Sequence, residues 1–167
     1  LSTDVEITLE ANPDDVSQEK ADSWYKAGVN RLSIGVQSFL QKDLKIMNRA
    51  HNADEALEAI QIIKNVGFTN YSVDLMFALP GLTNKMWVQN LKQVIELNVP
   101  HLSCYNLTVE EGTALNHLMS NNKIAPISEN TSAPQFSLTM ELLEKAGYDQ
   151  YEISNYCLPG MESKHNS

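Results

Sequence analysis

Residues 28–37 read GVNRLSIGVQ, and this stretch decides the fold class of the chain. A helix stop at Gly28 is followed by a strand in which apolar side chains alternate with polar or small ones. The apolar set is Leu32, Ile34 and Val36, and the opposite set is Arg31, Ser33, Gly35 and Gln37. We therefore expect one face of this strand to pack against helices and the other to line a polar space.

The same alternation recurs in other predicted strands, so the polar face belongs to a whole sheet. Five strands are predicted, at Val5–Glu10, Arg31–Gln37, Tyr71–Phe77, His101–Thr108 and Tyr148–Ser154. Parallel strands that are buried on both faces read as nearly continuous apolar runs, which most of these strands do not. Inward carboxylates, amides and hydroxyls are costly unless they are paired or bonded to a ligand, so the pattern favours a bound polar molecule.

Helices are predicted between the strands. They run from about Ser17 to Ala27, Asn52 to Gly67, Thr83 to Asn98 and Ser132 to Ala146, with a short helix over Gln41–Arg49. The long helices end at Gly or Asn followed by an apolar residue, the pattern of a left-handed C-terminal cap. Because strands follow helical crossovers, we expect an α/β fold with a largely parallel sheet, and residues 110–127 as a lid or an excursion. An antiparallel sheet with one solvated face is the alternative, and the intervening helices argue against it.

The composition describes one soluble globular domain and excludes several partners. The 167 residues carry 12 basic and 21 acidic side chains, a formal net charge of −9, and 43% of them are hydrophobic. Nucleic acids and anionic membranes are held by positive charge, and the apolar runs are too short to span a bilayer. We expect no nucleic-acid partner, no need for a membrane, and a cytoplasmic location. The two cysteines, Cys104 and Cys157, make neither a disulfide framework nor a four-thiolate metal site.

Polar residues stand at or near the carboxyl ends of four successive predicted strands: Glu10, Gln37, Asp74 and Thr108. Ligand sites on parallel barrels are built from those ends and from the loops that follow them. Each residue taken alone is more readily explained as a satisfied rim residue, and as a set they indicate a binding site. Ser103 and Tyr105 compete with Thr108 for the inward face of their strand.

Three motifs resemble the radical S-adenosylmethionine superfamily. They are TLEANP at residues 8–13, GVNRLSIGVQSF at 28–39 and DLMFALPGLT at 74–83, and the likeness continues through PHLSCYNLT at 100–108 to residues 151–154 and 164–166. Within the superfamily, the chain is most similar to the oxygen-independent coproporphyrinogen III oxidase family and its heme-chaperone branch. The resemblance implies a partial (β/α)6 TIM-like barrel. Residues 1–167 would be a single-domain fragment of it that lacks the first strands.

The resemblance also implies S-adenosylmethionine and a [4Fe–4S] cluster as cofactors of the intact protein, with heme or a porphyrinogen as a further ligand. S-adenosylmethionine would contact Glu10, Gln37, Arg49, Asp74 and the backbone near Thr108. Arg49 can bind a carboxylate through two parallel hydrogen bonds, and its alternative role is a cation at a helix C-terminus. The chain has no CxxxCxxC motif, so the cluster cysteines are expected upstream of Leu1. Cys104 and Cys157 would then be ordinary buried thiols.

Two functions compete under this resemblance. A heme chaperone binds heme and delivers it to a recipient protein, and the oxidase converts two propionates of coproporphyrinogen III to the vinyl groups of protoporphyrinogen IX. Three features favour the chaperone: EANP at residues 10–13 where oxidases resemble EVDP, Ser38 where oxidases tend to carry Asp, and the pair His165-Asn166. That pair resembles the start of the chaperone branch's HNxxYW motif, so His165 is the candidate heme ligand. We expect no catalysis from residues 1–167 alone.

A third interpretation stays open. An unrelated barrel enzyme would use the carboxylates of Glu10 and Asp74 for acid–base chemistry and would need no cluster. The remaining histidines, His51, His101 and His117, have no constellation of ligands or catalytic groups around them in the sequence, and no role is assigned to them.

Overall fold

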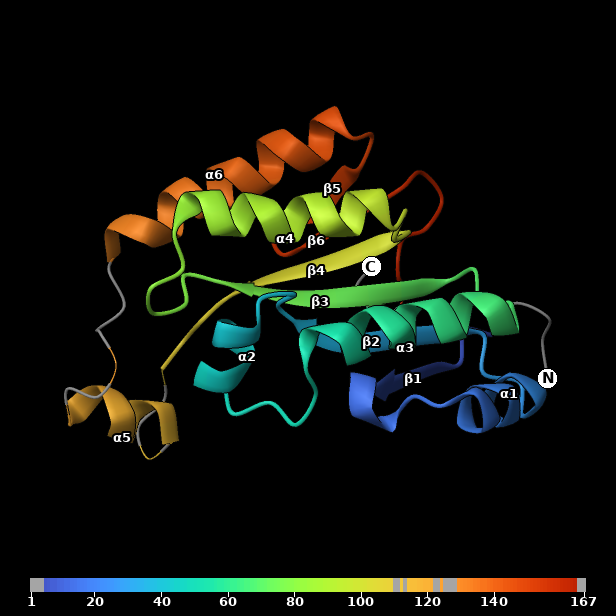
Figure 1. The fold of residues 1–167 in the computed structure, drawn as a ribbon. Coiled ribbons are helices and arrows are strands. Elements are labelled where there is room, and N and C mark those ends of the chain that lie inside the picture. The colour runs from blue at the N-terminus through green and yellow to red at the C-terminus, as the bar shows by residue number, and fades with distance from the viewer. Residues whose placement is uncertain (1–4, 110–111, 113, 122–123, 125–128, 165–167) are drawn as a thin grey trace.

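The computed structural model describes residues 5–109, 112, 114–121, 124 and 129–164. Within them, six strands form one sheet in the order β1-β2-β3-β4-β6-β5 (Figure 1). Neighbouring strands are parallel from the first to the fourth, which confirms the predicted α/β class. These four strands are β1 (Thr8–Ala11), β2 (Arg31–Gln37), β3 (Tyr71–Phe77) and β4 (His101–Asn106).

The end of the sheet differs from the prediction. The segment expected to form a fifth parallel strand contains β5 (Asp149–Glu152), which turns directly into β6 (Asn155–Cys157). β6 pairs antiparallel with both β4 and β5, so it lies between them. The expectation of a single parallel strand over Tyr148–Ser154 is wrong, because a connection as short as residues 153–154 joins only antiparallel strands.

The predicted helices form, with the expected caps at several ends. Ser17 and Thr83 accept hydrogen bonds at the N-termini of α1 and α4, and Asn52 and Glu55 form a capping box at α3. α6 begins three residues earlier than predicted, at Glu129 instead of Ser132. The helices are α1 (Gln18–Lys26), α2 (Gln41–Ile46), α3 (Ala53–Val66), α4 (Asn84–Glu96), α5 (Ala114–Ser120) and α6 (Glu129–Lys145), with a 3-10 turn η1 (Pro13–Asp15).

Two predicted strand ends are also corrected. Pairing of β1 with β2 begins at Thr8, so Val5 and Ile7 precede the strand and are 42% and 40% exposed. They do not meet the helices as the alternation predicted, because the edge of the sheet leaves them uncovered. At the other side of the sheet β4 ends at Asn106, and Thr108 lies in the segment that follows it.

The hydrophobic core lies between the sheet and the helices. Ile34 and Leu75 on the strands are fully buried with Ile60 of α3 and Leu91 of α4. α1 packs on α3, and α4 packs on α6 (Figure 1). The polar residues of the same strands face the opposite side, which confirms the alternation argument. Among the helices that the structure describes, none has the length and apolarity needed to cross a bilayer.

Candidate functional site

Three cavities follow the polar side of the sheet, and Asp74 lines all of them. One of about 350 Å³ brings together Glu10, Gln37, Arg49 and Asp74. A second, of about 990 Å³, is shared by Gln37, Arg49, Asp74 and Thr108. The third, of about 790 Å³, extends from Glu10 and Asp74 to Arg31. All five residues expected to bind S-adenosylmethionine therefore line cavities that have Asp74 in common, and Asp74 itself lies in the middle of β3.

Asp74 is held in a chain of hydroxyl groups on the polar face of the sheet. Ser33 Oγ donates to Asp74 Oδ2 at 3.3 Å, and Ser72 Oγ donates to Ser33 Oγ at 3.0 Å. Burial raises the pKa of Asp74 to about 6; hydrogen bonds from Ser103 and Ser33 oppose this rise, and the nearby Glu10 carboxylate adds to it. The site thus contains a carboxyl group that titrates close to neutral pH.

Gln37 reaches the cavities from a distorted strand end. The β2–β3 register pairs Ile34 with Val73 and then Gln37 with Leu75, so β2 contains one extra residue. Gln37 itself has a positive φ of 67°, a conformation that is uncommon for residues other than glycine. Bulges and such backbone outliers are frequent at functional sites, where they redirect a side chain.

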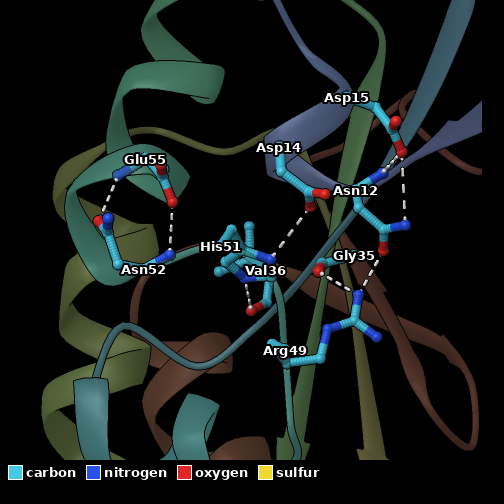
Figure 2. Close-up of polar contacts among 9 residues, drawn as sticks. All are labelled: Asn12, Asp14, Asp15, Gly35, Val36, Arg49, His51, Asn52 and Glu55. Carbon is cyan, nitrogen blue, oxygen red and sulfur yellow. Dashed lines mark hydrogen bonds and ion pairs between the residues drawn. The ribbon is translucent and has the colours of Figure 1, made fainter.

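Arg49 connects two loops of the site. Its guanidinium donates to the carbonyl oxygen of Gly35 at 3.2 Å and also to Asn12 Oδ1 (Figure 2). Arg49 lies beyond the last residue of α2, Ile46, and its backbone N–H donates to the carbonyl oxygen of Leu44 in the last turn of that helix at 2.9 Å, whereas its guanidinium contacts the site. The alternative of a helix-terminal cation does not describe this arrangement.

Gly35 lines the 350 Å³ cavity and leaves room for the polar side chains around it. A Cβ atom at this position would lie 3.1 Å from Gln37 Nε2, 3.3 Å from Asn12 Oδ1 and 3.4 Å from a guanidinium nitrogen of Arg49. Because the first two separations are shorter than ordinary van der Waals contacts, a side chain at this position would push against Gln37 and Asn12, and the glycine lets the polar groups converge.

The competition for the inward face of β4 has a clear outcome. Ser103 and Tyr105 line the 790 Å³ cavity from the strand itself. Thr108 is exposed, and it lines the 990 Å³ cavity from the segment after the strand, together with Met76 and His117. His165, the candidate heme ligand, lies outside the described residues.

Two histidines that were given no role are buried. His51 is 2% exposed, and its Nε2 lies 3.0 Å from the carbonyl oxygen of Val36 next to the site (Figure 2). His101 is fully buried; its Nε2 lies 2.6 Å from the hydroxyl of Tyr151, and burial lowers its pKa to about 3. The sequence placed Arg49 two residues from His51, but nothing in it indicated which carbonyl the imidazole would meet.

Comparison with known proteins identifies the family. The model of the radical SAM superfamily matches residues 1–94, which is more than half of the chain. This chain belongs to the radical SAM superfamily. Membership implies S-adenosylmethionine and a [4Fe–4S] cluster as cofactors, in agreement with the expectation from the motifs.

Relatives within the superfamily are similar over nearly all of the chain. The heme chaperone HemW of Bacillus subtilis is 40% identical over 161 residues, 96% of this chain and 42% of that protein. HemW of Escherichia coli is 40% identical over 166 residues, 99% of this chain and 43% of that protein. This radical SAM chain therefore spans less than half the length of the curated relatives that it matches.

Solved structures of radical SAM proteins share the fold. The coproporphyrinogen III oxidase HemN of Escherichia coli superposes with a TM-score of 0.83 at 26% identity, over 94% of this chain and 36% of that one. Elp3 of Methanocaldococcus infernus gives a TM-score of 0.70 at 25% identity, over 86% of this chain and 32% of that one. The sheet is thus part of a radical SAM TIM-like barrel, as predicted.

The residues of this radical SAM chain fit one implied cofactor and not the other. Carboxylates, an amide and a guanidinium converge around Gly35 in the 350 Å³ cavity. These groups complement the amino, carboxylate and hydroxyl groups of S-adenosylmethionine. The chain has only two cysteines, both buried, and burial raises the pKa of each thiol. Buried protonated thiols are poor ligands, so Cys104 and Cys157 do not form a cluster site.

Proposed function

We propose that this chain is the S-adenosylmethionine-binding part of a heme chaperone. The observation that carries the proposal is the convergence of Glu10, Gln37, Arg49 and Asp74 on one cavity, in a chain about 40% identical to HemW proteins. Because the chain covers about two fifths of those relatives, heme binding and delivery belong to the proposal and concern the intact protein.

Each residue of the site has a role that its chemistry supports. The carboxylates of Glu10 and Asp74 accept hydrogen bonds from ribose hydroxyls or from the amino group, and Gln37 both donates and accepts. Arg49 binds the methionine carboxylate, and the backbone near Thr108 borders the wider end of the cavity. In the intact protein, S-adenosylmethionine and the cluster together would supply one-electron chemistry. The protein's own contribution is to bind and orient it.

The rest of the proposal concerns the intact protein. We propose that cysteines outside residues 1–167 hold the [4Fe–4S] cluster, that His165 ligates heme iron, and that heme passes to a recipient protein. Residues 1–167 form one domain of that longer protein, which acts in the cytoplasm. The buried, unpaired thiols of Cys104 and Cys157 support a reducing compartment.

The first experiment uses the full-length protein, purified and reconstituted with iron and sulfide without oxygen. We expect S-adenosylmethionine to bind, and hemin to bind with a shifted Soret band. His165→Ala should abolish the Soret shift, while the variant still forms the cluster and binds S-adenosylmethionine. An unchanged Soret spectrum in His165→Ala would refute the heme-ligand role.

Coproporphyrinogen III oxidase is the second candidate, supported by the superposition on HemN. The same reconstituted protein is incubated with coproporphyrinogen III, S-adenosylmethionine and a reductant. Formation of protoporphyrinogen IX would favour the oxidase, and hemin binding without turnover favours the chaperone. Failure to form a cluster and to bind S-adenosylmethionine would contradict both and favour an acid–base role for Glu10 and Asp74.

A further inference from the structure

Gln37 is the centre of a strained three-residue turn. Its φ is 67°, and the N–H of Ser38 donates to the carbonyl oxygen of Val36 at 2.8 Å. A hydrogen bond between residues i and i+2 around a positive φ is the γ-turn that is rare in proteins because it is strained. Such a conformation persists only where surrounding contacts enforce it.

His51 supplies a second hydrogen bond to the same carbonyl. Its Nε2 lies 3.0 Å from the oxygen of Val36, and a carbonyl only accepts, so Nε2 carries the proton. The other ring nitrogen, Nδ1, lies 3.7 Å from Asp14 Oδ1 and has no hydrogen-bond partner among the described residues.

The imidazole is placed by a rigid neighbour. His51 directly precedes Asn52, whose Oδ1 accepts from the N–H groups of Asp54 and Glu55 at the start of α3. Glu55 Oε2 accepts from the N–H of Asn52 at 2.7 Å and completes the capping box (Figure 2). The backbone that follows His51 is therefore anchored to the end of a helix of 14 residues.

The loop that carries His51 thus holds two successive backbone groups of the bulged strand. Arg49 binds the carbonyl of Gly35, and His51 binds the carbonyl of Val36. The next residue is Gln37, whose side chain enters the cavity. Fixing these two carbonyls removes the freedom of the backbone to relax the turn and withdraw the Gln37 side chain.

We propose that His51 is a positioning residue for the ligand site: its Nε2–H holds the Val36 carbonyl and keeps Gln37 in the conformation that presents its amide to S-adenosylmethionine. This inference rests on the S-adenosylmethionine binding proposed above. His51 itself does not line the cavity, so it acts through the turn and not by touching the ligand.

The test compares two substitutions of His51 in the full-length protein. In His51→Gln the amide nitrogen has a reach similar to that of Nε2 and keeps the donor to Val36. In His51→Asn the amide nitrogen replaces Nδ1 and this donor is lost. Equilibrium binding of S-adenosylmethionine should weaken about tenfold in His51→Asn and stay within about threefold of the wild type in His51→Gln. Unfolding midpoints of the two variants should be similar. Equal affinities in the two variants, or losses that follow the unfolding midpoints, would overturn the proposal.

A second readout needs no ligand. Labelling with ¹³C-carbonyl valine and ¹⁵N-glutamine selects Val-Gln pairs, which occur in this chain at residues 36–37 and 88–89. The amide resonance of Gln37 should shift in His51→Asn and return toward the wild-type position in His51→Gln, while that of Gln89 stays constant as an internal control. If the wild type does not bind S-adenosylmethionine, the proposed function fails and this resonance alone decides the role of His51. An unshifted Gln37 amide in His51→Asn would refute it.

Discussion

Replacing Gln37 by glycine should stabilise the fold and weaken ligand binding. A left-handed residue other than glycine costs about 1–2 kcal/mol, and glycine adopts this conformation without that cost. Glycine also has more conformational entropy in the unfolded chain, which lowers the free energy of unfolding by about 0.5–1 kcal/mol. Because Gln37 is only partly buried and has a φ of 67°, we expect Gln37→Gly to raise the free energy of unfolding by about 0.5–1 kcal/mol.

Gln37→Ala is the matched control for this experiment. It removes the same polar group but keeps the strained backbone conformation, so its free energy of unfolding should stay close to that of the wild type. The difference in this free energy between Gln37→Gly and Gln37→Ala then measures the backbone strain alone. Asn98→Gly is a second comparator, because Asn98 has a φ of 50° and asparagine tolerates this conformation. Asn98→Gly should therefore raise the free energy of unfolding by less than Gln37→Gly does.

Urea denaturation followed by circular dichroism gives the free energies, and equilibrium binding gives the affinity for S-adenosylmethionine. Both Gln37 variants should bind about tenfold more weakly, because each has lost the amide. If Gln37→Gly is no more stable than Gln37→Ala, the turn is not strained and the reasoning about its enforcement by His51 loses its basis.

Three further substitutions test two residues of the site and one buried contact of α6. Burial raises the pKa of Asp74 from 3.8 to about 6, so the folded protein holds a proton that the unfolded chain has released, and stability is lost as pH rises through this interval. Asp74→Asn should remove that loss, gaining about 2 kcal/mol over the wild type between pH 4 and pH 7 in urea titrations. Gly35→Ala should weaken this affinity about tenfold by crowding three polar groups, with the free energy of unfolding within about 1 kcal/mol of the wild type. Gln135→Leu should cost about 2–4 kcal/mol in urea denaturation, because it leaves the N–H of Ala78 and the carbonyl of Leu82 unpaired.

Each of these results has an opposite that would contradict the structure. A stability difference between Asp74→Asn and wild type that does not change with pH would mean that Asp74 is not buried enough to titrate near neutrality. If Gly35→Ala binds S-adenosylmethionine as tightly as the wild type, the ligand does not lie next to Gly35. A Gln135→Leu variant as stable as the wild type would show that the two backbone groups find other partners.

The positions of the two central strands and their faces could be read from local sequence. The predicted bounds of β2 and β3, Arg31–Gln37 and Tyr71–Phe77, match the structure, because each strand alternates with period two between a helix cap and a turn. The cap of α3 at Asn52 was visible for the same reason, since a capping box involves residues three apart. These signals are short-range and need no knowledge of the fold.

The site was predicted in two ways. Glu10, Gln37 and Asp74 were predicted from the rule that parallel strands end at one edge of a sheet. The three residues line one cavity, but Asp74 lies in the middle of β3 and not at its end. Arg49 came from the family resemblance alone, because a loop arginine carries no local signal of the carbonyl that it binds. Thr108 was placed on the strand, whereas β4 ends at Asn106.

The sequence by itself determined the α/β class, the polar and apolar faces of the central strands, and the polar residues near the strand ends where we propose the ligand site. Only the tertiary structure decided the insertion of β6 between β4 and β5, the extra residue in β2, and the contact of His51 with Val36. Strand order and bulges depend on how distant segments pair, and a buried hydrogen bond depends on which groups packing brings together. The spacing of apolar residues within one helix or strand encodes neither of these features. The contact of His51 with the turn at Gln37 therefore became visible only in the folded chain.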